Sequence, residues 1–129
     1  MGEVFYSSEF INEQEIVIKT SNRAFNYGDG FFETIKIINT KPFNFSAHYI
    51  RFSSACKVLK LKNNQTERSL FSLLNQLIEK NKIVNGVAKI HVNRSGEGKY
   101  LPFSDGFEIF ISINKESGFV KTTPFINAN

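Results

Sequence analysis

The sequence predicts an α+β fold: a two-layer sandwich in which a mostly antiparallel sheet carries two helices on one face. Three runs, at residues 31–38, 87–94 and 107–114, place apolar residues at every second position, which is typical of half-buried strands. Two segments with apolar residues at helical spacing lie between the first run and the second. Because strands, helices and strands follow one another in blocks, the order favours this arrangement over alternating strand–helix units.

The N-terminal region contains short strand-like pieces. Residues 4–6 and 10–11 flank two serines, which predicts a β-hairpin. Residues 15–19 (Glu-Ile-Val-Ile-Lys) have the composition of a further extended piece. Residues 22–26 are expected to form a loop or a single helical turn.

A Gly-Asp-Gly turn leads into the first long strand. Gly28 and Gly30 allow a positive φ or a close backbone approach, and Asp29 can hydrogen-bond nearby amides. The alternation of the strand places these side chains on one face: Phe31, Glu33, Ile35 and Ile37. The other face carries Phe32, Thr34, Lys36 and Ile38. Such a turn can aim the first strand residues into a binding site, and a plain loop-to-strand junction is the alternative.

The first helix is predicted after a return strand at residues 41–44, which Pro42 keeps short or at an edge. Ser46 is a suitable N-cap for this helix, which should run to about Leu61. Its apolar residues predict a broad buried face made of two rows: Tyr49, Phe52, Cys56 and Leu59, and then Ile50, Ala55 and Val58.

The second helix begins after a polar break. Asn64 together with Glu67, or Thr66 alone, can cap it, and it should run to about Lys82. Its apolar stripe consists of Leu70, Leu73, Leu74, Leu77 and Ile78.

The composition describes a folded domain with a single cysteine. The chain has 129 residues and 41% apolar content, which suits one domain with a real core. Residues 1–114 are expected to form that domain, and residues 115–129, which show no pattern, a linker or an unpaired tail. Cys56 cannot form an internal disulfide, so a reducing cytoplasm fits this chain.

Charge and hydropathy argue against several classes of function. The 16 basic and 12 acidic residues are dispersed, which disfavours a nucleic-acid interface, while the net charge of +4 suits an acidic or phosphorylated small ligand. No apolar run approaches the roughly 20 residues that span a bilayer, and the N-terminus lacks the pattern of a secretory signal. The 14 phenylalanines predict a buried face that another domain or subunit completes.

Three motifs occur together in this chain. They are Arg-Ala-Phe-Asn-Tyr-Gly-Asp-Gly-Phe-Phe-Glu-Thr at residues 23–34, Lys-Pro-Phe at residues 41–43, and His-Tyr-Ile-Arg-Phe at residues 48–52. In this combination they resemble the N-terminal domain of the class IV aminotransferase family, the fold-type IV pyridoxal-phosphate enzymes. That family includes branched-chain and D-amino-acid aminotransferases. Residues 94–102 (Arg-Ser-Gly-Glu-Gly-Lys-Tyr-Leu-Pro) are similar to the Gly-rich segment of its 4-amino-4-deoxychorismate lyase branch.

The resemblance implies roles for individual residues. Arg51 matches the arginine that binds the cofactor phosphate, and a helix-surface arginine in a salt bridge is the alternative. Phe32 and Tyr27 match aromatics that border the substrate pocket, with core packing as the alternative. Arg94 matches a strand-end position near the substrate carboxylate, or it positions a loop. Lys99 matches a basic residue in the Gly-rich loop, which can reach a neighbouring subunit's site.

Two further residues are expected to be structural. His48 precedes Arg51 by three residues, so the two share a helix face. A structural role is expected for His48, such as capping or bonding to the Gly-Asp-Gly loop, rather than proton transfer. Glu33 lies on the strand face opposite Phe32. No metal site is expected, because His91 is the other histidine and no ligand cluster is visible in the sequence.

The resemblance also implies a second domain. The family chain is about twice this length, and its second domain supplies the Schiff-base lysine, which is therefore expected beyond residue 129. Lys121 stands in a Lys-Thr pair like that of the cofactor site, but it follows the final strand too soon. The 129-residue chain alone is expected to be inactive. The complete protein is expected to be a cytoplasmic homodimer that uses pyridoxal 5'-phosphate on a small-molecule amino substrate, with the lyase branch favoured by residues 94–102.

A non-enzymatic function is the alternative. A stand-alone α+β module could bind a phosphorylated ligand or a protein partner through the uncovered, Phe-rich face of its sheet. The reading frame after the codon for Asn129 discriminates between the two: a continuing domain with a lysine favours the enzyme, and a stop favours the module.

Overall fold

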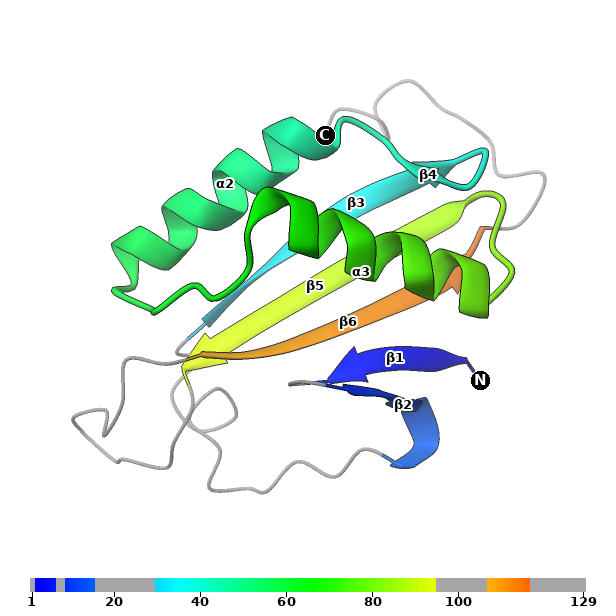
Figure 1. Cartoon of the computed structure of the whole chain (residues 1–129), viewed down its shortest axis with the longest axis horizontal. Helices are drawn as coiled ribbons and strands as arrows, with labels where there is room; N and C mark the ends of the chain where they lie inside the picture. Colours follow the sequence, from blue (N-terminus) through cyan, green and yellow to red (C-terminus); the bar gives the residue numbers. More distant parts are fainter. Residues whose placement is uncertain (1, 7–8, 16–29, 95–106, 117–129) are drawn as a thin grey trace.

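A computed structural model describes residues 2–6, 9–15, 30–94 and 107–116. These residues form a two-layer α+β sandwich, in which one sheet carries both described helices on the same face (Figure 1). The sheet has the strand order β2-β1-β6-β5-β3-β4, and every neighbouring pair is antiparallel. The predicted fold class is therefore confirmed.

The elements have the following bounds: β1 Glu3–Tyr6, β2 Glu9–Asn12, a 3₁₀ turn Glu13–Glu15, β3 Gly30–Ile38, β4 Lys41–Pro42, α2 Phe45–Val58, α3 Glu67–Lys80, β5 Gly86–Arg94 and β6 Phe107–Lys115. The hairpin of β1 and β2 and the three long strands lie where the sequence predicts them. The predicted return strand at residues 41–44 is shorter, because only Lys41 and Pro42 pair with β3. Of the predicted extended piece at residues 15–19, Glu15 belongs to the 3₁₀ turn, and the rest lies outside the described residues.

The three long strands β3, β5 and β6 make up the centre of the sheet. Gly30 lies opposite Asn93, and Ile37 lies opposite Gly86, so β3 and β5 pair over almost their whole length. A methyl group at Gly30 would collide with the carbonyl oxygen of Val92. The predicted close backbone approach is therefore present at Gly30, where it fixes the first residue of β3 against β5.

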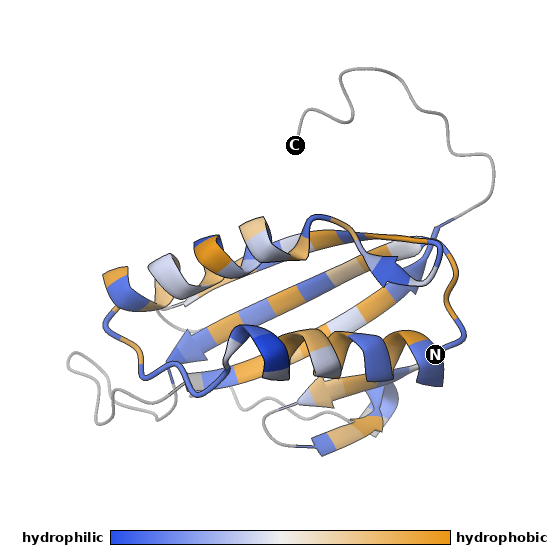
Figure 2. Cartoon of the chain, turned by 45° about the horizontal axis from the view of Figure 1, so that its top comes forward, coloured by the Kyte–Doolittle hydropathy of each residue, from blue (hydrophilic) through white to orange (hydrophobic). Residues whose placement is uncertain are grey.

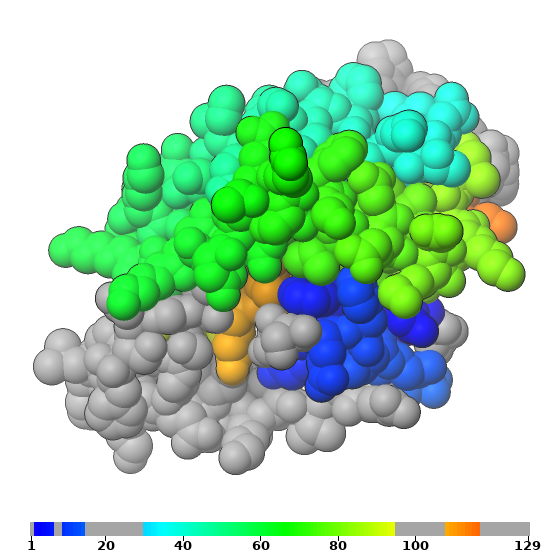
Figure 3. Space-filling model, viewed as in Figure 1, coloured from blue at the N-terminus to red at the C-terminus, as the bar shows by residue number. Residues whose placement is uncertain are grey.

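The hydrophobic core lies between the sheet and the helices. Strand residues at alternating positions enter it, and Figure 2 shows hydrophobic and hydrophilic residues alternating along β5. Its largest fully buried side chains are Phe52, Ile35, Ile37, Leu70, Leu74, Leu77, Ile90 and Ile111. In the space-filling view of Figure 3, α2 and α3 form the outer surface over this face of the sheet.

The two helices use their apolar residues differently. In α3 the predicted stripe is buried at Leu70, Leu74, Leu77 and Ile78. In α2 the first predicted row is buried at Phe52 and Cys56, but 64% of Ile50 and 78% of Val58 are exposed. The predicted broad buried face of the first helix is therefore wrong. The physical reason is position: α2 lies beside β3 towards one edge of the sheet (Figure 1), where only a narrow helix face meets the core.

The start of α2 also differs from the prediction. Asn44 precedes the helix in the left-handed conformation, with φ of 57°, and makes no side-chain cap. The predicted N-cap, Ser46, lies inside the first turn, where its hydroxyl donates to Glu67 Oε2 at 2.7 Å. That bond joins the two helices.

For α3, Thr66 is the N-cap, and its side chain accepts from the backbone N–H of Ser69, so this alternative of the prediction is confirmed.

Both helices end before the predicted residues. Lys60 and Lys82 have φ of 58° and 55°, and a left-handed residue at this position ends a helix. The helices therefore stop at Val58 and Lys80 rather than at Leu61 and Lys82. Among the described residues, neither helix is long and apolar enough to cross a membrane.

Candidate functional site

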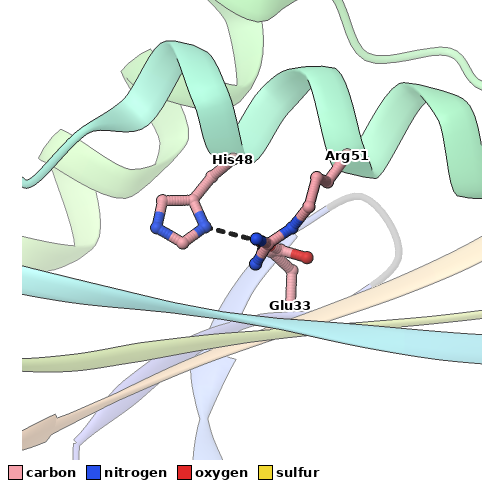
Figure 4. Close-up of polar contacts among 3 residues, drawn as sticks. All are labelled: Glu33, His48 and Arg51. Carbon is pink, nitrogen blue, oxygen red and sulfur yellow. Dashed lines mark hydrogen bonds and ion pairs between the residues drawn. The ribbon is translucent and has the colours of Figure 1, made fainter. Parts of the chain in front are cut away.

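A cluster of three side chains joins the sheet to α2. Glu33 stands near the start of β3 and faces the helices, and His48 and Arg51 project towards it from neighbouring turns of α2 (Figure 4). The guanidinium of Arg51 donates to Glu33 Oε2 at 2.7 Å, and His48 Nδ1 lies 2.5 Å from the same oxygen. Because an ionised carboxylate only accepts hydrogen bonds, this geometry places a proton on His48 Nδ1.

Exposure changes steeply across this cluster. The side chains of Glu33 and His48 are 9% and 17% exposed, whereas that of Arg51 is 69% exposed. A buried carboxylate is costly unless partners satisfy it, and here two nitrogens do so. The cluster therefore has a buried part, Glu33 and His48, and an exposed cationic part, the Arg51 guanidinium. This arrangement is suitable for holding an anion at the surface of α2.

The resemblance was the signal for Arg51, and the structure adds its partner. The expectation that Glu33 lies opposite Phe32 is confirmed. The sequence did not indicate that Glu33 would bond to Arg51, because residues of a strand and a helix meet only once the two layers are packed. His48 makes a hydrogen bond, but the partner is Glu33 of β3. The predicted bond to the Gly-Asp-Gly loop involves residues that lie largely outside the described part of the chain, so it stays a prediction.

Arg94 ends β5 on the helix-covered face and is 9% exposed. Its guanidinium donates to the carbonyl oxygen of Leu59 at 2.5 Å, and Leu59 is the C-cap residue of α2. Arg94 thus joins the end of β5 to the end of α2. This contact matches the loop-positioning alternative for Arg94, and its expected role at a substrate carboxylate stays a prediction.

Phe32 lies on the opposite face of the sheet and is 60% exposed. It begins a row of four rings, which we call the ring row: Phe32, His91, Phe110 and Tyr6. These residues stand directly opposite one another on β3, β5, β6 and β1, with ring centroids 5.8, 5.8 and 6.2 Å apart. Lys89 Nζ lies 5.3 Å from the Phe32 ring. The ring row is thus a continuous line of aromatic rings that begins with the predicted substrate aromatic, Phe32.

Two groups of the ring row have shifted acid–base behaviour. Burial, with a smaller contribution from the positive charge of Lys89, lowers the pKa of His91. Burial, together with the charge of Glu108, raises the pKa of Tyr6. Both shifts favour the uncharged ring, so the rings of this row carry no charge at neutral pH. Sequence reasoning missed this row, because its signal is the strand register and not a local motif.

Two of the predicted residues, Tyr27 and Lys99, lie outside the described residues, as do Gly28, Asp29 and Lys121. Their roles stay predictions. The remaining features of the described part offer little chemistry. Within residues 2–6, 9–15, 30–94 and 107–116 no three metal-ligating side chains gather. Burial raises the pKa of the Cys56 thiol to about 11, so this thiol is not a nucleophile at neutral pH.

A separate hollow of about 530 Å³ lies between the turn after β3 and the end of α3. Thr40, Lys41, Ile78 and Lys82 are among its lining residues, and none of the predicted site residues is. It is therefore distinct from the cluster around Arg51.

Comparisons with known proteins point to one family. Residues 30–117 match the family described as Amino-transferase class IV. The D-alanine aminotransferase of Staphylococcus epidermidis is 32% identical over 94 residues, which are 73% of this chain and 33% of that protein. The aminodeoxychorismate lyase of Bacillus subtilis is 26% identical over 92 residues, which are 71% of this chain and 31% of that protein.

A solved structure has the same fold. The T.th. branched-chain amino acid aminotransferase, in complex with pyridoxamine 5'-phosphate, superposes with a TM-score of 0.83 at 17% identity. The superposition covers 93% of this chain and 41% of that one. The chain thus matches about a third of the length of its sequence relatives and less than half of this structural neighbour. Because the family match extends over most of the chain, from β3 to the end of β6, this protein belongs to the class IV aminotransferase family.

Proposed function

We propose that this chain is the N-terminal part of a pyridoxal-phosphate-dependent enzyme that acts on small amino substrates, as an aminotransferase or a lyase. The family match and the names of the relatives, D-alanine aminotransferase and aminodeoxychorismate lyase, support the enzyme class. The observation that carries the proposal is the exposed guanidinium of Arg51, which a buried carboxylate holds at the junction of α2 and β3.

Arg51 is the proposed ligand of the cofactor phosphate. A guanidinium is always charged and presents up to five N–H donors in a planar fork that fits phosphate oxygens. One donor group of Arg51 contacts Glu33, and the exposure of the side chain leaves space for an anion. The donor chemistry therefore fits pyridoxal 5'-phosphate. When bound, the pyridine ring of the cofactor stabilises negative charge on the substrate carbon whose bond breaks.

The substrate side of the proposal involves four residues. The exposed ring of Phe32 provides an apolar wall, and Tyr27 is the second aromatic that we assign to it. Arg94 and Lys99 are the cationic residues proposed to attract a substrate carboxylate. For Arg94 this role requires its guanidinium to leave the Leu59 carbonyl oxygen, which it contacts on the face of the sheet opposite Phe32. The lysine that holds the cofactor is proposed to lie beyond residue 129, in a second domain, and this chain alone is proposed to be inactive.

The reaction type has two candidates. Transfer of an amino group is supported by the 32% identity to a D-alanine aminotransferase. A lyase reaction is supported by the Gly-rich residues 94–102, and by the 26% identity to an aminodeoxychorismate lyase. An assay that follows pyruvate release from aminodeoxychorismate, beside one that follows amino transfer from D-alanine to a keto acid, separates the two.

The assembly that we propose is a cytoplasmic homodimer with no nucleic-acid or membrane partner. The exposed Phe32 on the open face of the sheet is consistent with a surface that a second domain or subunit completes. The alternative, a non-enzymatic module that uses this face for a phosphorylated ligand or a partner protein, predicts no continuing reading frame after Asn129 and no cofactor absorbance in the purified gene product.

The assignment of Arg51 is tested with two arginine variants of the gene product, Arg51→Gln and the control Arg68→Gln. Arg68 is also exposed, but it lies on α3. Absorbance titration with pyridoxal 5'-phosphate measures the dissociation constant for each. Because charge-assisted hydrogen bonds contribute about 1.5–3 kcal/mol, R51Q should weaken binding by about tenfold or more, and R68Q should leave it unchanged.

Equal affinities for R51Q and the unmodified protein would show that Arg51 does not hold the phosphate. An equal loss in both variants would point to a general effect of positive charge rather than to a site on α2.

A further inference from the structure

Glu33 places a negative charge directly beside the arginine to which we assign a phosphate. Its Oε2 lies 2.7 Å from the Arg51 guanidinium, and the carboxylate is only 9% exposed. If Arg51 acted by charge attraction alone, this carboxylate would oppose binding, because it offsets the positive charge that an anion needs. The position of Glu33 therefore calls for a role other than electrostatic attraction.

Geometry supplies such a role. An exposed arginine has many rotamers, and a ligand that binds it must immobilise the side chain. The bond to Glu33 fixes one edge of the Arg51 guanidinium before any ligand arrives. Because the guanidinium is planar, fixing one edge also sets the directions of its other N–H groups.

His48 holds Glu33 in turn. Its Nδ1 contacts the same oxygen, Oε2, that accepts from Arg51, and His48 and Arg51 lie on one face of α2 (Figure 4). Both ends of the arrangement are anchored in regular structure, β3 for the carboxylate and α2 for its two partners. The carboxylate consequently has one defined orientation below the guanidinium.

We propose that Glu33 is a positioning residue, which pre-orients the Arg51 guanidinium for a phosphate group, and that His48 fixes the carboxylate of Glu33. This inference rests on the proposed function of Arg51 and extends it to two residues that do not touch the ligand. The proposal has one distinctive consequence: for phosphate binding, the length of the side chain at position 33 matters more than its negative charge.

Two substitutions at position 33 separate reach from charge. Glu33→Asp keeps the negative charge but shortens the side chain by one methylene, so the bond to Arg51 is lost. Glu33→Gln keeps the length and an oxygen that can accept from Arg51, but removes the charge. If Glu33 positions Arg51, phosphate binding falls in E33D and is retained in E33Q. If its charge matters more, E33D resembles the unmodified protein and E33Q binds phosphate more tightly.

The readout is the affinity gained from the phosphate alone. The complete gene product, freed of cofactor, is titrated with pyridoxal 5'-phosphate and with pyridoxal. The dissociation constant for pyridoxal divided by that for pyridoxal 5'-phosphate is the ratio that isolates the contribution of the phosphate. General damage to the fold lowers both affinities and leaves the ratio unchanged. Because immobilising an arginine typically costs enough to change binding by about threefold to tenfold, the ratio should fall by that factor in E33D and by less than about twofold in E33Q.

Arg51→Gln in the same titration distinguishes the two proposals. If R51Q lowers the ratio and E33D does not, Arg51 holds the phosphate but Glu33 does not position it, and the inference is overturned. If R51Q leaves the ratio unchanged, the proposed function of Arg51 itself has failed, whatever E33D does, and the positioning role falls with it. A loss in R51Q and E33D, with E33Q retained, supports both.

Discussion

The two faces of β3 differ in how completely the described residues account for them. On the helix-covered face, Glu33, Ile35 and Ile37 are buried and have their partners within the chain. On the open face, Phe32 is 60% exposed although its ring lies beside the His91 ring of the ring row and the Lys89 ammonium. The contacts on the helix-covered face show how the fold holds Arg51 in place. The open face leaves most of the Phe32 ring accessible to solvent.

The largest expected effect tests the contrast in stability. Ile90 on β5 is fully buried on the covered face, so Ile90→Ala should lower the free energy of unfolding by about 2–5 kcal/mol. Phe32→Ala, on the open face, should lower it by less than about 1 kcal/mol. Urea unfolding measures both. Both are measured on the 129-residue chain, and a loss for F32A as large as that for I90A would break the comparison, because it would mean that the Phe32 ring is buried within this chain.

The next prediction concerns the pairing register of β3 and β5, which determines which residues lie on each face of the sheet. Gly30→Ala places a methyl group against the carbonyl oxygen of Val92. Separating β3 from β5 at this point should lower the free energy of unfolding by about 1–3 kcal/mol, as overpacking does elsewhere. Circular dichroism during thermal unfolding follows it. Ser112→Ala, at a half-buried position in the middle of β6, is the control and should change stability little.

The smallest effect is a pH dependence that belongs to the open face. The pKa of His91 in the folded protein lies below its ordinary value of 6.5, chiefly because of burial. Just below pH 6.5 the unfolded chain therefore binds more protons than the folded one, so the free energy of unfolding decreases as pH falls. Well above pH 6.5 His91 has no such effect.

His91→Gln should reduce this slope, and urea unfolding between pH 5 and about pH 8 measures it. The same slope in H91Q and in the unmodified protein would show that the ring row does not suppress protonation of His91.

The sequence allowed much of the fold to be predicted, because the alternation in β3, β5 and β6 and the stripe of α3 are local patterns. It misled at Ile50 and Val58, whose spacing is as helical as that of Phe52. Their exposure depends on where α2 lies on the sheet, and no local pattern contains that information. The same holds for Ser46, a good cap by type, which instead bonds to α3.

The candidate site, too, could be predicted from local patterns only in part. Arg51 could be found from motifs, whereas its bond to Glu33 and the ring row depend on contacts between elements far apart in the sequence. His91 and Phe110 carry no motif, and they become neighbours of Phe32 only through the strand register.

The contact between Arg94 and Leu59 has a mechanical consequence. Within the described residues, polar contacts join α2 to the sheet both along the helix, at Glu33, and at its C-terminal end, at Arg94. A helix held by one contact can pivot about it, whereas a second contact further along the helix restrains that motion. A displacement at the end of β5 must therefore either break the contact at Leu59 or carry α2 with it. As long as both contacts hold, the positions of Arg94 and Arg51, which stand far apart in the sequence, are coupled through α2.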